Sequence, residues 1–361
     1  MSILVLVGSI VLIAVAVWDA FAAVVLPRRV TRLLRPTRLV LRVVWTLWAL
    51  PARASRTGRW REDWLSIYGP LGVLILLVTW AAAMIVGFAL LQWALGAQLA
   101  AGGSGVDFGT ILYFSGTTLL TLGPGDVVPR SGAARLLTVV EVGMGFGLLA
   151  LVISYLPVLY QSFSRREVQI STLDEWAGSP PSAGELLRRL GRFGSLASID
   201  SLLEQWERWA AELMETHLSY PILAYYRSQH ENQSWLAALT TILDLCALVI
   251  AGIDGVPPRP ARLAFAMARH GTVDITQMLA TAPRVPTYDR LPPADLARLR
   301  AVLAEAGVPL HGDEAADARL AELRATYEPY VCALSAHLLM PLPAWLPTAE
   351  ARDNWQTTAW E

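Results

Sequence analysis

The sequence contains no lysine, only two cysteines and few charged residues of either sign. All 29 of its basic residues are arginine, which we attribute to the nucleotide composition of the gene rather than to a physical requirement. Charged residues make up 16% of the chain and the net charge is -1, so no basic field indicates a nucleic-acid partner. The spacing of Cys246 and Cys332 matches neither a CxxC redox pair nor a zinc site, so we expect buried free thiols.

The sequence also lacks the motifs of common enzyme and cofactor-binding domains. No nucleophile–base pair or phosphate-binding loop indicates an enzyme, and we expect no bound cofactor. There is no βαβ unit with a glycine fingerprint, and no series of short strands typical of a nucleotide-binding barrel. One group of side chains fits no known set of metal ligands, so we expect these histidines to be packed or exposed: His217, His230, Glu231, His270 and Asp274.

Apolar residues are in excess, and they are unevenly distributed. They make up 54% of the chain, and the mean hydropathy of +0.44 is typical of a membrane protein. Long apolar runs are concentrated in residues 2–160, whereas residues 161–361 alternate apolar and charged residues. We therefore expect a membrane part followed by a water-soluble part, which is helical by its spacing of apolar residues.

Three segments are long and apolar enough to cross a membrane as helices: residues 3–26, 67–96 and about 133–160. Residues 20–22 resemble a signal-peptide cleavage site. The first segment has no basic N-terminal region, however, and stays apolar beyond that point, so we expect it to be retained. Ten arginines lie between the first and second segments, and Arg130 alone lies between the second and third. The positive-inside rule predicts that the first connection is cytoplasmic and that the N-terminus is outside.

Two further segments are alternatives for a fourth crossing. Residues 38–51 would place five arginines outside if they crossed, so we favour a helix in the cytoplasmic interface, with Trp45 and Trp48 at headgroup depth. Residues 236–250 carry Asp244 at their centre, which is costly in a bilayer. We favour a helix of the soluble part there, capped near Asn232.

The segment between the second and third spans cannot be an ordinary external loop. Asp107 is placed to cap a short helix over residues 108–119, which is too short to cross the membrane, so the chain must dip in and return. Gly123 and Gly125 follow, and they allow positive φ in alternation with ordinary residues, so that carbonyl oxygens can face a dehydrated cation. Thr121 can add a hydroxyl oxygen, and the carbonyl end of the short helix a negative potential.

The order of outer helix, short helix, T-x-G-x-G-D loop and inner helix resembles the pore module of the potassium channel family, in particular the prokaryotic channels with two core helices. The resemblance covers about residues 67–160 and includes the whole stretch “LYFSGTTLLTLGPGDVVP”. It implies an external mouth at Asp126 and an ion-binding selectivity filter formed by Thr121, Leu122, Gly123, Pro124 and Gly125. It also implies a homotetramer in the lipid bilayer of the cell membrane, with potassium as the permeant ion.

One filter position departs from the family, because Pro124 stands where an aromatic residue is usual. A weakly selective cation channel therefore stays an alternative, as does a non-conducting receptor or scaffold. A re-entrant hairpin that only connects two helices is a further alternative, but it leaves the threonine, the aspartate and the capped helix unexplained.

The third span contains three glycines, a carboxylate and a proline. The glycines in “GMGFG” indicate close helix packing, and the resemblance implies a gating hinge at Gly145, which can serve both purposes. Glu141 is the only carboxylate of the span, so we expect it to hydrogen-bond behind the filter or the short helix as pore support. Pro157 is expected to interrupt the helix near its cytoplasmic end.

The sequence thus predicts an all-α protein in four parts. These are an N-terminal transmembrane helix (1–26), a basic cytoplasmic or interfacial segment (27–66), a pore domain resembling that of potassium channels (67–163) and a helical cytoplasmic domain (164–361). Helices of the last part are expected to begin near Pro293 and Glu314. This domain assembles the tetramer or gates the pore, and the sequence does not identify its ligand or regulator.

Overall fold

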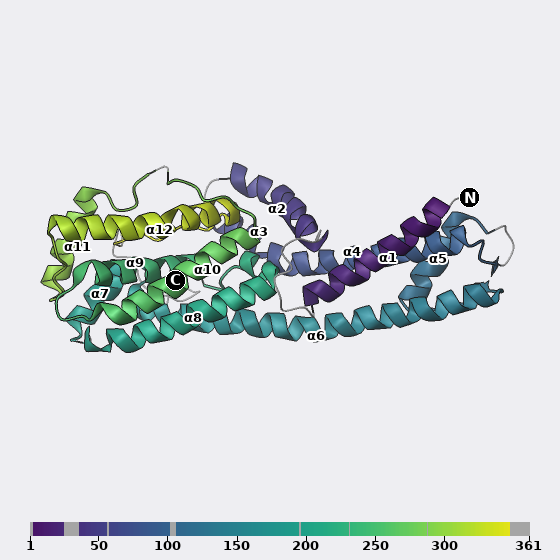
Figure 1. Ribbon diagram of the computed structural model, residues 1–361, viewed down its shortest axis with the longest axis horizontal. Helices are drawn as coiled ribbons and strands as arrows, with labels where there is room; N and C mark the ends of the chain where they lie inside the picture. The colour runs from purple at the N-terminus through teal and green to yellow at the C-terminus, as the bar shows by residue number, and fades with distance from the viewer. Residues whose placement is uncertain are drawn as a thin grey trace. The chain divides into compact units, whose positions relative to one another are not determined.

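A computed structural model describes residues 3–24, 36–55, 58–101, 106–194, 196–230, 232–286 and 288–346. Within these residues the fold is all-α apart from two strands of three residues each, and Figure 1 shows the helices. Contacts divide the chain into two compact units, Met1–Tyr160 and Gln161–Glu361. Much of the predicted basic segment, residues 27–35 and 56–57, lies outside the described residues, as do residues 25–26 of the predicted first span.

The first unit holds most of the long apolar helices. Its elements are α1 (Ile3–Val24), α2 (Pro36–Ala54), α3 (Arg59–Ser66), α4 (Tyr68–Ala94), β1 (Leu99–Ala101), α5 (Phe108–Leu119), β2 (Val127–Pro129) and the first part of α6 (Gly132–Ala177). α4 packs against both α1 and α5. Gly87 lets α1 approach α4 closely, since a Cβ there would lie 2.6 Å from the Ile13 Cγ1 atom.

α2 packs against the protein through its tryptophans, and the prediction that both lie at headgroup depth stays a prediction. Trp45 is buried and its ring meets that of Tyr68 edge-on, with 4.8 Å between centroids. The Tyr68 hydroxyl donates to the Leu41 carbonyl at 2.5 Å. Trp48 stacks on Trp64 at 4.2 Å, and each indole N–H donates to the carbonyl of the other residue. α2 is therefore anchored by protein contacts.

Asp19 joins three helices of the first unit. It lies in α1, and its side chain is buried. Its Oδ2 atom accepts hydrogen bonds from the backbone N–H of Thr37 at 3.0 Å and from the Thr37 hydroxyl, both in α2. The indole N–H of Trp80 in α4 donates to the same oxygen at 2.9 Å. The one charged residue of the first apolar run thus satisfies donors from both neighbouring helices.

Replacing Asp19 with alanine is expected to lower the stability of the protein. The Thr37 and Trp80 N–H groups would lose their acceptor, at about 1–3 kcal/mol for each buried donor left unpaired. Thermal unfolding of the detergent-solubilised protein measures this. Asp19→Asn keeps an acceptor oxygen and should cost less. Thr46→Ala removes only an exposed hydroxyl bonded within α2 and serves as the control. Equal melting temperatures for Asp19→Ala and Thr46→Ala would contradict the prediction.

α6 is longer than the sequence predicts. It runs for 46 residues, passes through Pro157 and contributes residues to both units. The predicted interruption is therefore wrong: proline removes one backbone hydrogen bond, but its fixed φ is close to the helical value, so the helix continues. Among the described residues, four helical segments are long and apolar enough to cross a membrane: α1, Arg59–Ala94, α6 and α9 (Trp235–Gly252).

The second unit is a helical domain built around α9. Besides the end of α6, its α-helices are α7 (Ala183–Arg192), α8 (Ile199–Ser219), α9, α10 (Pro258–Met278), α11 (Pro293–Glu305) and α12 (Glu314–Leu338). α10 and α12 pack against α9, which is almost wholly buried although its composition would suit a membrane. The helix is capped by Ser234, two residues after Asn232, near which the sequence predicts the cap: the Ser234 hydroxyl accepts from the Ala237 N–H at 3.0 Å.

A buried ionic cluster explains Asp244 at the centre of α9. Arg290 pairs with both of its carboxylate oxygens, the shorter contact being 2.6 Å. Tyr327 of α12 donates its hydroxyl to the same carboxylate, and Glu328 lies 3.3 Å from Arg290. Asp244, whose charge was expected to keep α9 out of the membrane, is thus paired with Arg290 inside the second unit.

The predicted free thiols are present, and the histidines are packed or exposed. Cys246 is buried, whereas Cys332 is half-buried rather than fully buried as predicted. Burial, followed by the nearby Arg166 guanidinium, lowers the pKa of His217 to about 3. The ring is therefore neutral: Nδ1 donates to the Leu213 carbonyl at 2.7 Å, and Nε2 accepts from Arg166.

The described residues contain no group of side chains that could hold a metal ion. His270 is exposed and lies 3.1 Å from Asp274. Glu231 lies outside the described residues.

Candidate functional site

α5 is capped as the sequence predicts. The Oδ1 atom of Asp107 accepts from the backbone N–H of Thr110 at 2.8 Å and from its hydroxyl at 2.6 Å. The helix has 12 residues, about half the length needed to cross a bilayer. Its carbonyl end therefore stops partway and directs its negative partial charge at the loop that follows.

The loop after α5, which we call the 121–125 loop, has a backbone that alternates in handedness. Thr121, Gly123 and Gly125 have φ values of 57°, 53° and 79°. Leu122 and Pro124 between them do not have positive φ. The two glycines adopt the conformation the sequence predicts, while Thr121 adds a third such position, which is unfavourable for a residue with a branched side chain. Alternation of this kind can turn successive carbonyl groups toward one side.

The N–H groups at the start of this loop are tied to α5. Thr121 N–H donates to the Thr118 carbonyl at 3.0 Å, and Leu122 N–H donates to the Thr117 carbonyl at 2.8 Å. Within the described parts of the chain, by contrast, the carbonyl groups of residues 121–125 accept no hydrogen bond. All five residues are exposed in the single chain. Their carbonyl oxygens are thus available to coordinate a dehydrated cation.

Asp126 closes the loop next to a short two-stranded sheet. β1 and β2 pair antiparallel, with Ala101 opposite Val127, and the Arg130 N–H extends the pairing to Gln98 at 2.8 Å. Asp126 and Tyr113 of α5 line a hollow of about 500 Å³. The sheet holds the end of the loop, and the backbone hydrogen bonds to α5 hold its start.

Glu141 lies behind the short helix, as the sequence predicts. Its side chain is fully buried in the first unit. Gln92 of α4 donates from Nε2 to Glu141 Oε2 at 3.1 Å, and a hydrogen bond joins Ser115 Oγ of α5 to Glu141 Oε1. Ser115 Oγ also lies 2.9 Å from the Ile85 carbonyl of α4. One carboxyl group thus connects α6 with α4 and α5.

Gly145 marks a close approach of α6 to α5. A Cβ atom at this position would lie 2.0 Å from the Leu119 carbonyl oxygen and 2.9 Å from its carbon. Cβ positions at Gly143 and Gly147 would meet nothing within 4 Å. Of the two purposes the sequence leaves open for Gly145, close packing is therefore directly visible, and the packing partner is the last turn of α5.

Sequence reasoning did not identify Ser115 and Gln92 as the partners of Glu141. They lie 26 and 49 positions away along the chain, so no local pattern links them. Gln92 nevertheless carries a signal, because it is the only amide side chain in the apolar run 67–96. A polar side chain inside a span usually faces protein, and here it faces the carboxyl group of the next span.

Comparison with known proteins supports a broad class for the first unit. Residues 72–161 match a family model described as an ion channel. This match supports an ion channel. The matched residues include α5, the 121–125 loop, Glu141 and Gly145, and the range agrees closely with the predicted resemblance over residues 67–160.

One curated relative is similar over much of the chain. It is an uncharacterized membrane protein, YdjJ, of Bacillus subtilis (strain 168), which is 26% identical over 254 residues that cover 68% of this chain and 70% of the relative. No solved structure matches the chain. Together with the apolar helices, these similarities support a multi-pass membrane protein that contains an ion channel domain.

Proposed function

We propose that four copies of this chain form a channel that conducts potassium passively across the cell membrane. The observation that carries the proposal is the 121–125 loop, whose alternating backbone leaves a run of carbonyl oxygens without partners in the described chain at the negative end of α5. In this proposal residues 121–125 are the selectivity filter and Asp126 is the external mouth. The same oxygens would replace the water shell of a permeating cation.

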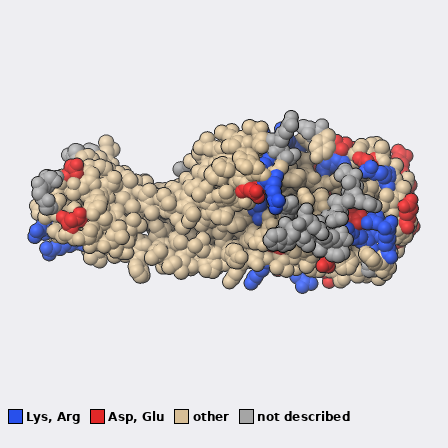
Figure 2. All heavy atoms as spheres, turned by 180° about the vertical axis from the view of Figure 1, so that it is seen from behind, with Lys and Arg blue, Asp and Glu red and all other residues tan. Residues whose placement is uncertain are grey.

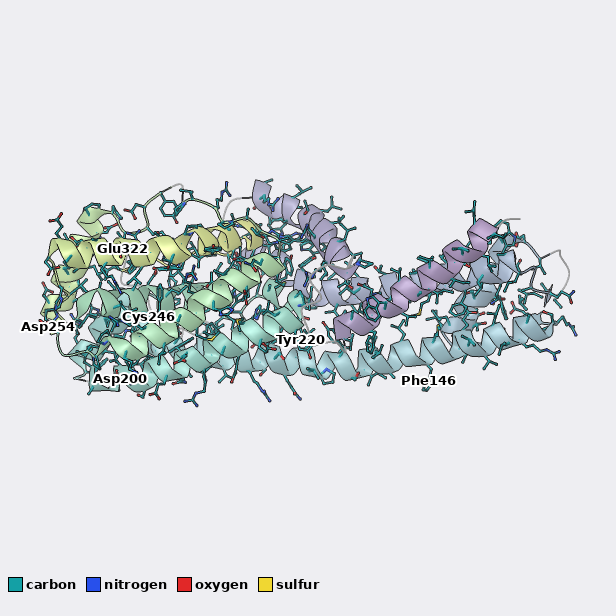
Figure 3. The ribbon with its side chains drawn as sticks, viewed as in Figure 1. Phe146, Asp200, Tyr220, Cys246, Asp254 and Glu322 are labelled. Carbon is teal, nitrogen blue, oxygen red and sulfur yellow. The ribbon has the colours of Figure 1, made fainter. Side chains whose placement is uncertain are left out.

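The assembly of four chains is supported by what the single chain leaves uncovered. One chain supplies one filter loop, which cannot surround an ion by itself. Only 6% of the most apolar window of α6 is buried, and Phe146 projects from this helix with 66% of its surface exposed (Figure 3). Other large apolar side chains are also exposed along α6: Leu136, Val139, Leu149 and Ile153. Neighbouring chains and lipid would cover these side chains.

The proposed orientation places the second unit in the cytoplasm. On the face shown in Figure 2, acidic and basic side chains gather over the second unit, while most of the first unit's surface carries neither. The arginines between the first two spans lie on the same side by the positive-inside rule. Because α6 contributes residues to both units, it offers a mechanical route by which the second unit could gate the pore.

Flux from the purified protein in liposomes is the decisive experiment. We expect a potassium flux that exceeds the sodium flux, from particles whose detergent-corrected mass equals four chains. Equal sodium and potassium fluxes would replace the potassium channel with a weakly selective cation channel, which the proline in the filter loop makes the second candidate. Intact four-chain particles without flux would indicate a scaffold instead. A monomer or dimer that conducts would contradict the tetramer.

A further inference from the structure

The contacts of Ser115 constrain where the protons lie around Glu141. Ser115 Oγ is within hydrogen-bonding distance of two oxygens, the Ile85 carbonyl at 2.9 Å and Glu141 Oε1. A serine hydroxyl has one proton and can donate to only one of them. The Ile85 carbonyl is only an acceptor. Both contacts are hydrogen bonds only if the Glu141 carboxyl group supplies a proton to Ser115.

The burial of Glu141 also favours a protonated carboxyl group. Glu141 is fully buried, and the side chains hydrogen-bonded to it, Gln92 of α4 and Ser115 of α5, are both uncharged. No positively charged or titratable side chain from α4, α5 or α6 interacts with it among the described residues. An unpaired carboxylate in such a place costs far more than a neutral carboxyl group.

We infer that Glu141 holds a proton at neutral pH and positions the pore helix α5 through a hydrogen-bond chain. In this chain Glu141 Oε1–H donates to Ser115 Oγ, and the Ser115 hydroxyl donates to the Ile85 carbonyl. Gln92 Nε2 donates to the other Glu141 oxygen. Glu141 thereby joins α6 to α4 and to α5, the helix that leads into the 121–125 loop, so it is a positioning residue that never touches the ion.

Loss of this proton would break the chain. Ionised Glu141 could only accept, so the Ser115 hydroxyl would turn toward it and release the Ile85 carbonyl. α5 would lose its link to α4, and a negative charge would be buried behind the loop. Alkaline pH should therefore close or inactivate the channel, a consequence that rests on the proposed conduction, whereas the protonation itself does not.

The protonation can be tested without any flux measurement. Exposed carboxyl groups are ionised at pH 7, so an infrared carbonyl band of a protonated carboxylic acid at that pH reports a buried group. We expect this band in reconstituted wild type and in Glu175→Gln, which removes an exposed carboxyl group of the same helix. Glu141→Gln should remove the band, and Ser115→Ala should shift it. An unchanged spectrum in both Glu141→Gln and Ser115→Ala would overturn the inference.

The positioning role is tested by the pH profile of flux. Wild type and Glu175→Gln should lose flux between neutral and alkaline pH, by up to about tenfold for each pH unit as the protonated fraction falls. Glu141→Gln should conduct without this loss, because its amide can donate to Ser115 and accept from Gln92 at any pH. The same alkaline loss in Glu141→Gln would overturn the positioning role. Absence of flux in every variant, with the infrared result intact, would reject the proposed conduction only.

Discussion

Replacing Gly145 with alanine is expected to abolish flux and to destabilise the protein. The new methyl group would lie 2.0 Å from the Leu119 carbonyl oxygen, well inside van der Waals contact. The obstacle is backbone at the carbonyl end of α5, so no side-chain rotation can relieve it. Either α6 moves away from α5 or the last turn of α5 shifts, and the second outcome displaces the 121–125 loop directly.

The expected change in the free energy of unfolding of Gly145→Ala is the sum of two opposing contributions. Alanine is a better helix former than glycine by about 1 kcal/mol, so an uncrowded substitution should be neutral or slightly stabilising. Overpacking at a close contact costs about 1–3 kcal/mol and occasionally more. Gly143→Ala and Gly147→Ala are matched controls, because their Cβ atoms would meet nothing within 4 Å in the same chain.

Melting temperature and liposome flux together separate packing from hinge bending. If Gly145 acts by packing, its alanine variant should melt below both control variants and lose flux. If it acts only as a hinge, the variant should melt at or above the control variants while its gating changes. A Gly145→Ala protein as stable and as active as Gly143→Ala would contradict both.

Local sequence signals predicted the helices of this protein better than their ends and partners. Asp107 was identifiable as a cap because it directly precedes the short apolar run. For α9, in contrast, the sequence placed the cap only near Asn232, without selecting the capping residue. The structure decides, because Asn232 has a φ of 61°, whereas a helix N-cap needs an extended backbone, which Ser234 has.

Tertiary contacts account for what the sequence could not show. Trp45 is buried because it packs against Tyr68. Tyr68 belongs to another helix, and no local sequence pattern links the two residues. The sequence indicated that the Glu141 side chain hydrogen-bonds behind the filter or the short helix. Its actual partners, Ser115 and Gln92, follow from the packing of three helices, which the sequence does not show. Alternating handedness at Gly123 and Gly125 was predictable, since glycine is the residue that tolerates it.

Gly123→Ala is expected to abolish conduction although nothing obstructs a side chain there. Gly123 has a φ of 53°, and a Cβ atom would meet nothing within 4 Å. The penalty is therefore conformational, about 1–2 kcal/mol in each chain for a left-handed alanine. In a tetramer four such penalties act on one ring of carbonyl oxygens. Gly132→Ala, where φ is not positive and space is also open, should conduct normally.

Pro124→Tyr should have the opposite outcome, with conduction preserved. Pro124 is the ordinary residue between two glycines of positive φ, so tyrosine can adopt its backbone conformation and still present the carbonyl oxygen. In the native chain, the rigid proline ring would hold the loop in place of the aromatic residue that potassium channels usually have. A tyrosine that restores aromatic packing should leave potassium selectivity equal or higher.

Reversal potentials in mixed potassium and sodium solutions measure that selectivity. Unchanged or increased preference for potassium in Pro124→Tyr, with loss of current in Gly123→Ala, is the result expected of a carbonyl filter. If Gly123→Ala conducts like Gly132→Ala, ion conduction does not depend on the backbone conformation of this loop, and the filter assignment is wrong. If instead the native protein passes sodium as readily as potassium and Pro124→Tyr gains selectivity, the proline itself makes this pore weakly selective.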